Sequence, residues 1–133
     1  MSFKKHNQNP KGFKRSDCVI RAISFALGKD YYQVLKDLYE IGVKKATIPS
    51  DPVAYRVYLE SFPKVPVMKE VWLRGGGEPA TITRKRLTVM DLCRSDGTYI
   101  VSVANHLTCV KDGVNYDLYD CRHKSAYEIW QVN

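Results

Sequence analysis

The sequence predicts an α+β domain in which N-terminal helices pack on a C-terminal antiparallel sheet. Segments with the apolar spacing of helices end near residue 63, and β-rich segments bounded by turn residues follow from residue 99. Helices followed by strands are typical of α+β domains, whereas alternating strands and helices would indicate parallel β-α-β units. The chain has 133 residues, 44% of them hydrophobic, which is enough for one compact domain. We expect a basic arm at residues 1–15 and a single domain at residues 16–133.

The first predicted helix, SDCVIRAISFALG, is the element around which we expect the domain to be organised. Ser16 is a favourable N-cap, and Gly28 is the residue type that ends helices in the left-handed conformation. The residues between them are mostly apolar, so other elements should cover the helix on both flanks. Cys18 lies in the first turn, where unpaired N–H groups and the helix dipole favour a thiolate. This position suits a nucleophilic cysteine.

Two further helices are predicted before the chain changes character. Asp30 caps the second helix, whose apolar residues keep helical spacing until Gly42 closes it. The third helix begins at Ser50 or Asp51 and stops at Pro63. Both helices carry apolar residues that can face a common core.

A less regular segment joins the helical region to the sheet region. Residues 65–73 are β-rich, although Pro66 restricts them to an edge strand or a loop. The sequence RGGGEPATITRKR, residues 74–86, predicts a mobile loop near a cleft, with room for a second short strand at residues 80–83. Residues 88–91, TVMD, have the pattern of a capping box and start a short helix.

The distribution of charge indicates which kinds of partner the chain could bind. The net charge is +7, and the cations concentrate in two segments. Residues 1–15 hold five Lys or Arg and no acid, and residues 74–86 hold four against one Glu. Such segments can lie along an acidic partner or phosphates. The aromatic-and-basic motifs of RNA-binding modules are missing, so we expect any nucleic-acid binding to be weak.

Other features of the composition predict a cytoplasmic protein without membrane association. No apolar run is long enough to span a membrane, and no apolar segment follows the first lysines as in a secretory signal. The spacing of the four cysteines fits neither a zinc site nor a disulfide framework. We therefore expect reduced thiols, no metal and no cofactor. No pattern in the sequence fixes an oligomeric state.

A cysteine nucleophile needs a base that holds its proton and a third group that orients the base. The chain has three histidines: His6 in the arm, His123 in a polar segment, and His106 at the start of a β-rich segment. Only His106 belongs to a predicted strand, which would hold its side chain in a fixed position. We therefore predict that His106 is the base.

The acid that orients His106 depends on the turn between the predicted strands at residues 106–111 and 114–119. If residues 111–113 form a three-residue loop, Asp120 lies on the face of His106. If residues 112–113 form a two-residue turn, the register slips by one and Asp117 comes onto that face. The alternating apolar residues of the two strands favour the two-residue turn, and both acids remain open.

Two blocks of the sequence resemble papain-like cysteine peptidases. SDCVIRAISFAL is similar to their nucleophile helix, particularly in the compact leader peptidases of bacteriocin exporters, where an acid precedes the cysteine as Asp17 does here. GTYIVSVANHLTCVKDGVNYDLYDC resembles their histidine strand, turn and acid strand. Small uncharacterised proteins of phages and Gram-positive bacteria are similar in both blocks. The resemblance covers about residues 9–28 and 97–121 and implies a papain-like domain at residues 16–133.

The resemblance also implies which acid is used. In such folds the acid ends the second strand, four residues after an aromatic, and Tyr116 and Asp120 have that spacing. On this ground we choose Asp120 and keep Asp117 as the alternative.

The oxyanion hole departs from the pattern of the family. Papain-like enzymes place a glutamine six residues before the cysteine, and this chain has Gly12 there. We expect Gln8 or Asn9 to supply the amide, with the backbone N–H of Cys18 as the other donor. Arg21, one turn beyond Cys18 on the same face, would contact substrate or, as surface arginines commonly do, cover apolar neighbours.

Together these features predict a cysteine-dependent hydrolase, a peptidase or isopeptidase, that acts on an amide bond of a protein or peptide substrate. Cys18 would attack the carbonyl, His106 would transfer the proton and Asp120 would orient the imidazole. The alternative function is a catalytically inactive binding protein of a phage or bacterium. Such a protein would block a host protein or nucleic acid through its basic arm and the loop at residues 74–86.

Overall fold

Helices cover one face of a sheet, as the apolar spacing of the first half predicted. The computed structural model describes residues 2–73, 77 and 79–133. In these residues the helices are α1 (Cys18–Leu27), α2 (Tyr31–Lys45), α3 (Pro52–Tyr58) and α4 (Val89–Leu92). The strands are β1 (Phe3–Lys5), β2 (Met68–Leu73), β3 (Thr81–Arg86), β4 (Thr98–Val103), β5 (His106–Lys111), β6 (Val114–Asp117) and β7 (Glu128–Gln131). The α+β class is therefore confirmed.

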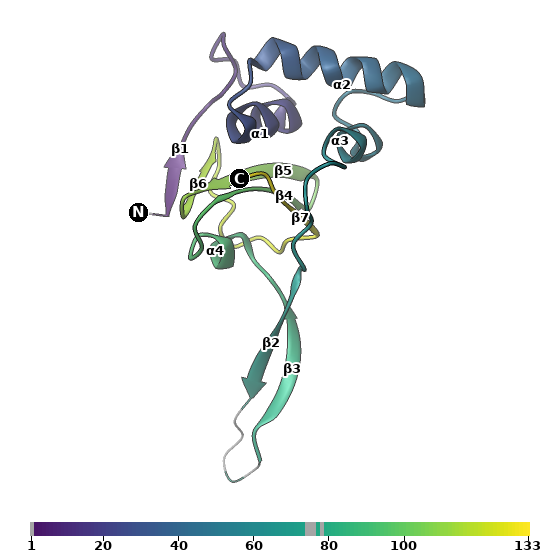
Figure 1. Ribbon diagram of the computed structural model, residues 1–133. Helices are drawn as coiled ribbons and strands as arrows, with labels where there is room; N and C mark the ends of the chain where they lie inside the picture. The colour runs from purple at the N-terminus through teal and green to yellow at the C-terminus, as the bar shows by residue number, and fades with distance from the viewer. Residues whose placement is uncertain (1, 74–76, 78) are drawn as a thin grey trace.

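The main sheet has the strand order β1-β6-β5-β4-β7. Its neighbouring strands pair antiparallel except at the edge, where β1 runs parallel to β6. Figure 1 shows α1, α2 and α3 on one side of this sheet and α4 on the other. α1 and α3 lie nearest the strands, and α2 packs on these two helices. α1 packs mainly along β5, close to the middle of the sheet.

Each face of the sheet is covered by its own apolar core. The core beneath the three helices includes Val19, Ile20, Ile23, Val34, Leu38, Leu59, Ile100, Leu107 and Trp130. The core on the side of α4 includes Val89, Leu92, Val101, Val103, Val110 and Ile129. β4 is buried along its whole length, because successive side chains of a strand point to opposite faces and both faces are covered. β4 is therefore packed on both faces.

Several predicted helix signals are present in the structure. Gly28 ends α1 in the left-handed conformation, with a φ of 63°. The carboxylates of Asp30 and Asp51 accept hydrogen bonds from backbone N–H groups in the first turns of α2 and α3. Asp91 accepts a hydrogen bond of 2.8 Å from the backbone N–H of Thr88, as the predicted capping box requires. Within the described residues, no helix combines the length and apolar character needed to cross a membrane.

Three helix boundaries differ from the predicted ones. α3 ends at Tyr58, before the predicted stop at Pro63. Asp17 rather than Ser16 is the N-cap of α1, and its side chain makes no capping hydrogen bond.

α2 continues past Gly42 and ends at Ala46, which adopts the left-handed conformation. A Cβ at Gly42 would lie 2.5 Å from the carbonyl oxygen of Thr47. This glycine therefore permits a close approach of the chain instead of ending the helix.

β2 and β3 form a separate two-stranded sheet that projects from the main body of the molecule (Figure 1). Trp72 and Ile82 lie opposite each other on this hairpin, and both are exposed. The loop predicted at residues 74–86 becomes strand β3 from Thr81 onward. The part of that prediction that falls on residues 74–76 and 78 lies outside the described residues.

The basic arm is joined to the sheet at its beginning. Phe3–Lys5 form β1, and the backbone N–H of His6 continues the contact by donating to the carbonyl of Asp117 at 2.9 Å. Lys4 and Lys5 remain exposed. Sequence analysis did not predict this strand, because three residues cannot display an alternating pattern of their own. The arm therefore lies alongside the elements that form the site described next.

Candidate active site

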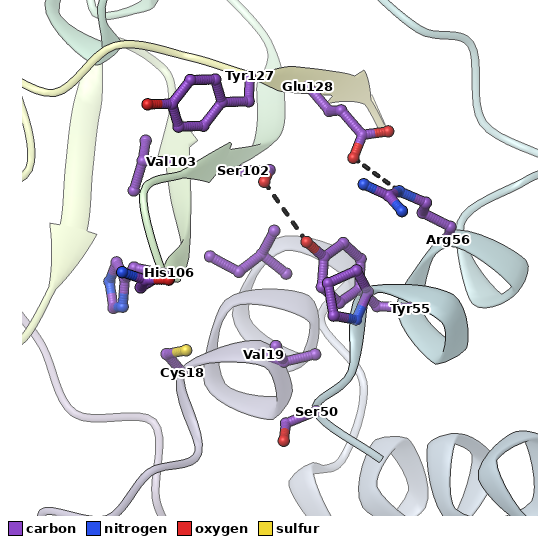
Figure 2. Close-up of a pocket in the computed structure, with 13 residues that line it drawn as sticks. Cys18, Val19, Ser50, Tyr55, Arg56, Ser102, Val103, His106, Tyr127 and Glu128 are labelled. Atoms are coloured by element: carbon purple, nitrogen blue, oxygen red, sulfur yellow. Dashed lines mark hydrogen bonds and ion pairs between the residues drawn. The ribbon is translucent and has the colours of Figure 1, made fainter. Parts of the chain in front are cut away.

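The start of α1 meets the start of β5 at one end of a cleft. Cys18 is the first residue of α1, and His106 is the first residue of β5. His106 and the backbone N–H of Leu107 lie near enough to the Cys18 thiol to lower its pKa. Figure 2 shows the sulfur of Cys18 just below the ring, with both side chains at the same side of the cleft. The structure thus brings together the predicted nucleophile and base.

The turn between β5 and β6 decides which acid meets His106. Asp112 and Gly113 both have positive φ, 48° and 81°, as a two-residue turn of type I′ requires. Lys111 accordingly pairs with Val114 across the turn. This is the register that the alternating apolar residues favoured, and the three-residue loop is wrong.

In this register Asp117 lies on the face of His106. Its Oδ2 accepts hydrogen bonds from Nε2 of His106 and Oγ1 of Thr108, both at 2.6 Å. Its Oδ1 accepts a hydrogen bond of 2.6 Å from the backbone N–H of Leu118. Only 4% of Asp117 is exposed. Asp117, the alternative acid of the sequence analysis, therefore occupies the position that orients the imidazole.

Asp120 lies elsewhere, so its prediction as the orienting acid is wrong. The residue follows the end of β6 and pairs on the surface with Arg122, at an N–O distance of 2.7 Å. The side chain of Asp120 is 41% exposed. The spacing from Tyr116 would have placed Asp120 on the second strand only if that strand continued to residue 120, whereas β6 ends at Asp117.

The electrostatic environment favours a thiolate beside an imidazolium. Burial by itself would raise the pKa of Cys18, but hydrogen bonds from His106 and a backbone N–H, with the charges of His106 and Arg21, bring this pKa below its ordinary value. Burial would lower the pKa of His106, but hydrogen bonds to Asp117 and to two thiols raise it to about 11. A lowered thiol pKa and a raised imidazole pKa both favour a Cys18 thiolate paired with a His106 imidazolium.

Arg21 connects the orienting acid to the residue before the nucleophile. Its Nε donates to Oδ1 of Asp17 at 2.7 Å, and its Nη1 donates to Oδ1 of Asp117 at 3.3 Å. All three side chains are buried. Burial by itself raises the pKa of each carboxyl, but the hydrogen bonds that Asp17 and Asp117 accept bring both pKa values below the ordinary value. Arg21 is buried, so the expected surface position is wrong. Arg21 does not line the cleft, and its contact with substrate stays a prediction.

The two residues predicted for the oxyanion hole make other contacts. Nδ2 of Asn9 donates to Oδ2 of Asp17 at 3.0 Å, and the hydroxyl of Tyr31 donates to the same oxygen at 2.7 Å. Nε2 of Gln8 donates to Oγ of Ser24 at 3.2 Å. Neither Gln8 nor Asn9 lines the cleft. The prediction is therefore wrong for both, because the arm runs beside α1 and its amides bond to side chains of the helix region.

The cleft beside Cys18 and His106 has a volume of about 560 Å³, within the range of small-ligand sites. Its walls come from the start of α1, the start of α3, the β4–β5 turn and the start of β7 (Figure 2). The lining combines apolar and aromatic side chains with a few polar ones: Val19, Pro52, Tyr55, Val103, Leu107 and Tyr127, with Ser50, Arg56, Ser102, Asn105 and Glu128. Arg56 pairs with Glu128 at 2.8 Å, so the cleft carries little net charge.

Cys121 is buried next to Asp117. Its Sγ is 3.5 Å from Oδ2 of Asp117. With His106, these residues offer three potential metal-ligand atoms within 4.8 Å of one another. Oδ2 of Asp117 already accepts hydrogen bonds from His106 and Thr108. We therefore interpret the group as a hydrogen-bonded cluster that fixes Asp117, not as a metal site.

The polar residues that support Asp117 were not predicted from the sequence. Nδ2 of Asn115 donates to Oγ1 of Thr108 at 2.9 Å, and Thr108 in turn donates to Asp117. Both Thr108 and Asn115 are fully or almost fully buried. The signal that could have found them is a polar residue at a strand position whose neighbours are apolar, because a buried polar group needs a partner.

Comparison with known proteins adds no assignment to this geometry. No protein-family model matches the chain, and neither a curated protein nor a solved structure matches it. The α+β class is what the structure shows, and the papain-like fold stays a prediction.

Proposed function

We propose that this chain is a thiol hydrolase with a papain-like fold that cleaves an amide bond of a peptide or protein. The observation that carries the proposal is the row formed by Cys18, His106 and Asp117. Nε2 of His106 is 2.6 Å from Asp117, which leaves Nδ1 for Cys18. A base with a nucleophile on one side and an orienting acid on the other is the arrangement that nucleophilic acyl transfer requires.

The reaction would proceed through an acyl-enzyme. The Cys18 thiolate attacks the amide carbonyl carbon, and the His106 imidazolium donates its proton to the amide nitrogen as the C–N bond breaks. The amine leaves, and the acyl group remains on Cys18 as a thioester. His106 then takes a proton from water, and the hydroxide attacks the thioester. Cys18 leaves as a thiolate, the carboxylic acid product departs, and His106 is again an imidazolium.

The oxyanion of the tetrahedral intermediate would be held at the start of α1. The backbone N–H of Arg21 is bonded to the carbonyl of Asp17, so the N–H groups before it point out of the first turn. The N–H of Cys18 is therefore our proposed donor. Gln8 and Asn9 have no part in this proposal.

The cleft supports a peptide as the substrate. Its volume of about 560 Å³ accommodates a short extended segment, and its apolar walls suit uncharged side chains. The Arg56–Glu128 ion pair lies across the cleft from Cys18 and His106 (Figure 2). The proposed substrate segment is therefore short and largely apolar next to the scissile bond.

Digestion of a peptide library tests the proposal directly. The full chain would be incubated with proteome-derived peptides, and new termini would be identified by mass spectrometry. We expect cleavage at a restricted set of amide bonds with the wild-type chain and none with Cys18→Ala.

Thiol labelling provides a second test that needs no substrate. Iodoacetamide at pH 6 should modify Cys18 first, because an ordinary thiol with a pKa of about 8.5 is almost fully protonated there. Burial raises the pKa of Cys93, and it raises that of Cys109 to about 12. These two thiols should therefore react slowly in the folded protein.

The rival function is an inactive binding protein. The exposed Trp72 and Ile82 on the projecting hairpin favour a partner surface, since exposed aromatic and apolar side chains are enriched at interfaces. Absence of cleavage, together with labelling of Cys18 no faster than that of the other thiols, would contradict the hydrolase and support the rival. Tight, sequence-specific binding of DNA or RNA at physiological salt would support the nucleic-acid form of that rival.

A further inference from the structure

We infer that Arg21 is a positioning residue of the proposed active site. It fixes Asp117 in the orientation that faces His106, and it supplies a buried positive charge that favours the thiolate form of Cys18. This inference rests on the proposed function and deepens it, because it assigns a role to a side chain that does not touch the substrate cleft.

The geometry divides the two oxygens of Asp117 between two partners. Oδ1 accepts from Nη1 of Arg21 at 3.3 Å, and Oδ2 accepts from Nε2 of His106 at 2.6 Å. Because Arg21 holds one oxygen, the carboxylate cannot rotate without breaking a charge-assisted hydrogen bond. The orientation of His106 therefore depends on a side chain from α1, the same helix that carries Cys18.

Arg21 is itself held by the residue that precedes the nucleophile. Its Nε donates to Asp17 at 2.7 Å, and Asp17 also accepts hydrogen bonds from Asn9 and Tyr31. The arm, α1, α2 and β6 thus meet in one polar cluster, in which Asp17, Arg21 and Asp117 are buried and Asn9 and Tyr31 are partly buried. The rigid guanidinium can bond two carboxylates at once, which an ammonium group cannot do with the same geometry.

The charges around Arg21 determine how its removal would change the pKa of Cys18. The titratable groups that face it come from the arm (His6), the N-cap of α1 (Asp17), α1 itself (Cys18), α2 (Tyr31) and β6 (Tyr116, Asp117). His106 of β5 contacts two of them, Cys18 and Asp117. Loss of the cation would leave two buried carboxylates near Cys18. A thiolate is disfavoured by nearby anions and favoured by nearby cations, so the pKa of Cys18 would rise.

The test compares the rate of Cys18 alkylation against pH in the full chain and its variants. Arg21→Gln removes the charge, and Arg21→Lys keeps it. Asp17→Asn combined with Arg21→Gln removes one charge of each sign, so the buried net charge stays the same while Asp117 loses its partner. Arg122→Gln is the matched control, since Arg122 pairs with Asp120 on the surface. Circular dichroism and urea unfolding establish which variants are folded.

For Arg21→Gln, we expect the midpoint of the alkylation profile to rise by at least about one pH unit, which means about tenfold slower labelling below the wild-type midpoint. The double variant should show a smaller rise, because it keeps the buried net charge and loses only the hydrogen bond that positions Asp117. Arg21→Lys should recover at least half of the shift seen in Arg21→Gln, and Arg122→Gln should match the wild type. A purely structural role would reduce the folded fraction without moving the midpoint.

Two outcomes would overturn the inference. A folded Arg21→Gln or double variant with the wild-type midpoint shows that Arg21 does not act on the site, and unfolding of all three Arg21 variants shows that it serves only the fold. Failure of the proposed function gives a different result. In that case the wild-type midpoint itself lies at or above the ordinary thiol value of about 8.5.

Discussion

Asp117 and Asp120 are close in the sequence but belong to two regions that use charge differently. Asp117 lies in the buried cluster between α1 and the sheet, where His106, Thr108 and Arg21 all donate to it. Asp120 lies on the surface after β6, where Arg122 is its partner. A buried carboxylate must be fully hydrogen-bonded, whereas a surface carboxylate can exchange its partner for water. The difference between the two acids indicates that burial, not position in the sequence, determines which acid can orient the histidine ring.

The largest effect is expected when the buried region loses its acid. Asp117→Ala would leave Arg21 and His106 without their shared acceptor, and breaking a buried pair in this way costs about 3–5 kcal/mol of folding free energy. Urea denaturation measures the loss. Asp120→Ala is the matched change in the surface region and should leave the denaturation midpoint unchanged. Equal losses in the two variants would show that the regions do not differ as the burial indicates.

The second-largest effect is expected on the reactivity of Cys18, when a histidine is removed from the buried region rather than from the surface. His106→Ala removes the hydrogen bond and the positive charge that lower the pKa of Cys18. We expect alkylation of Cys18 at pH 6 to become at least about tenfold slower, since the thiol would return to an ordinary or higher pKa. His123→Ala is the control, because His123 is exposed. An unchanged rate in His106→Ala would mean that the imidazole does not activate the thiol.

The smallest effect concerns stability in acid. The pKa of Asp117 is lowered because hydrogen bonds from His106 and Thr108 outweigh the opposing effect of burial. The unfolded chain therefore binds the proton more readily, so this stabilisation is present above the ordinary pKa of about 4 and is lost as the pH falls below it. In the wild type, the urea concentration at half unfolding should fall as the pH is lowered from 4 to 2. We expect a smaller fall in Asp117→Asn, because this variant has no carboxyl to protonate at that position.

The surface acid again provides the contrast. The pKa of Asp120 is lowered to about 2 by its hydrogen bonds with Arg122, but solvent screens an exposed pair and little of this shift becomes stability. Asp120→Asn should therefore keep the wild-type acid profile. A flattened profile in Asp120→Asn, with none in Asp117→Asn, would reverse the assignment of the two regions.

Much of the fold followed from local patterns. Gly28, Asp30 and Asp51 mark helix ends because backbone conformation and free N–H groups act over a few residues. β1 could not be predicted in the same way, since its three residues become a strand only through pairing with β6. The prediction that Gly42 ends the second helix was wrong for a related reason. Its role depends on the carbonyl of Thr47, which approaches only after the chain has turned back.

The sequence by itself determined the α+β class, the helix that begins at Cys18 and the strand that begins at His106, because periodicity and capping are local properties. Only the tertiary structure decided which acid serves His106. Two residues with positive φ set the β5–β6 register, and the burial of Arg21 between Asp17 and Asp117 completed the cluster. Register and burial depend on contacts between segments that are distant in the sequence. The free energy of those contacts cannot be inferred from the residues of one segment alone.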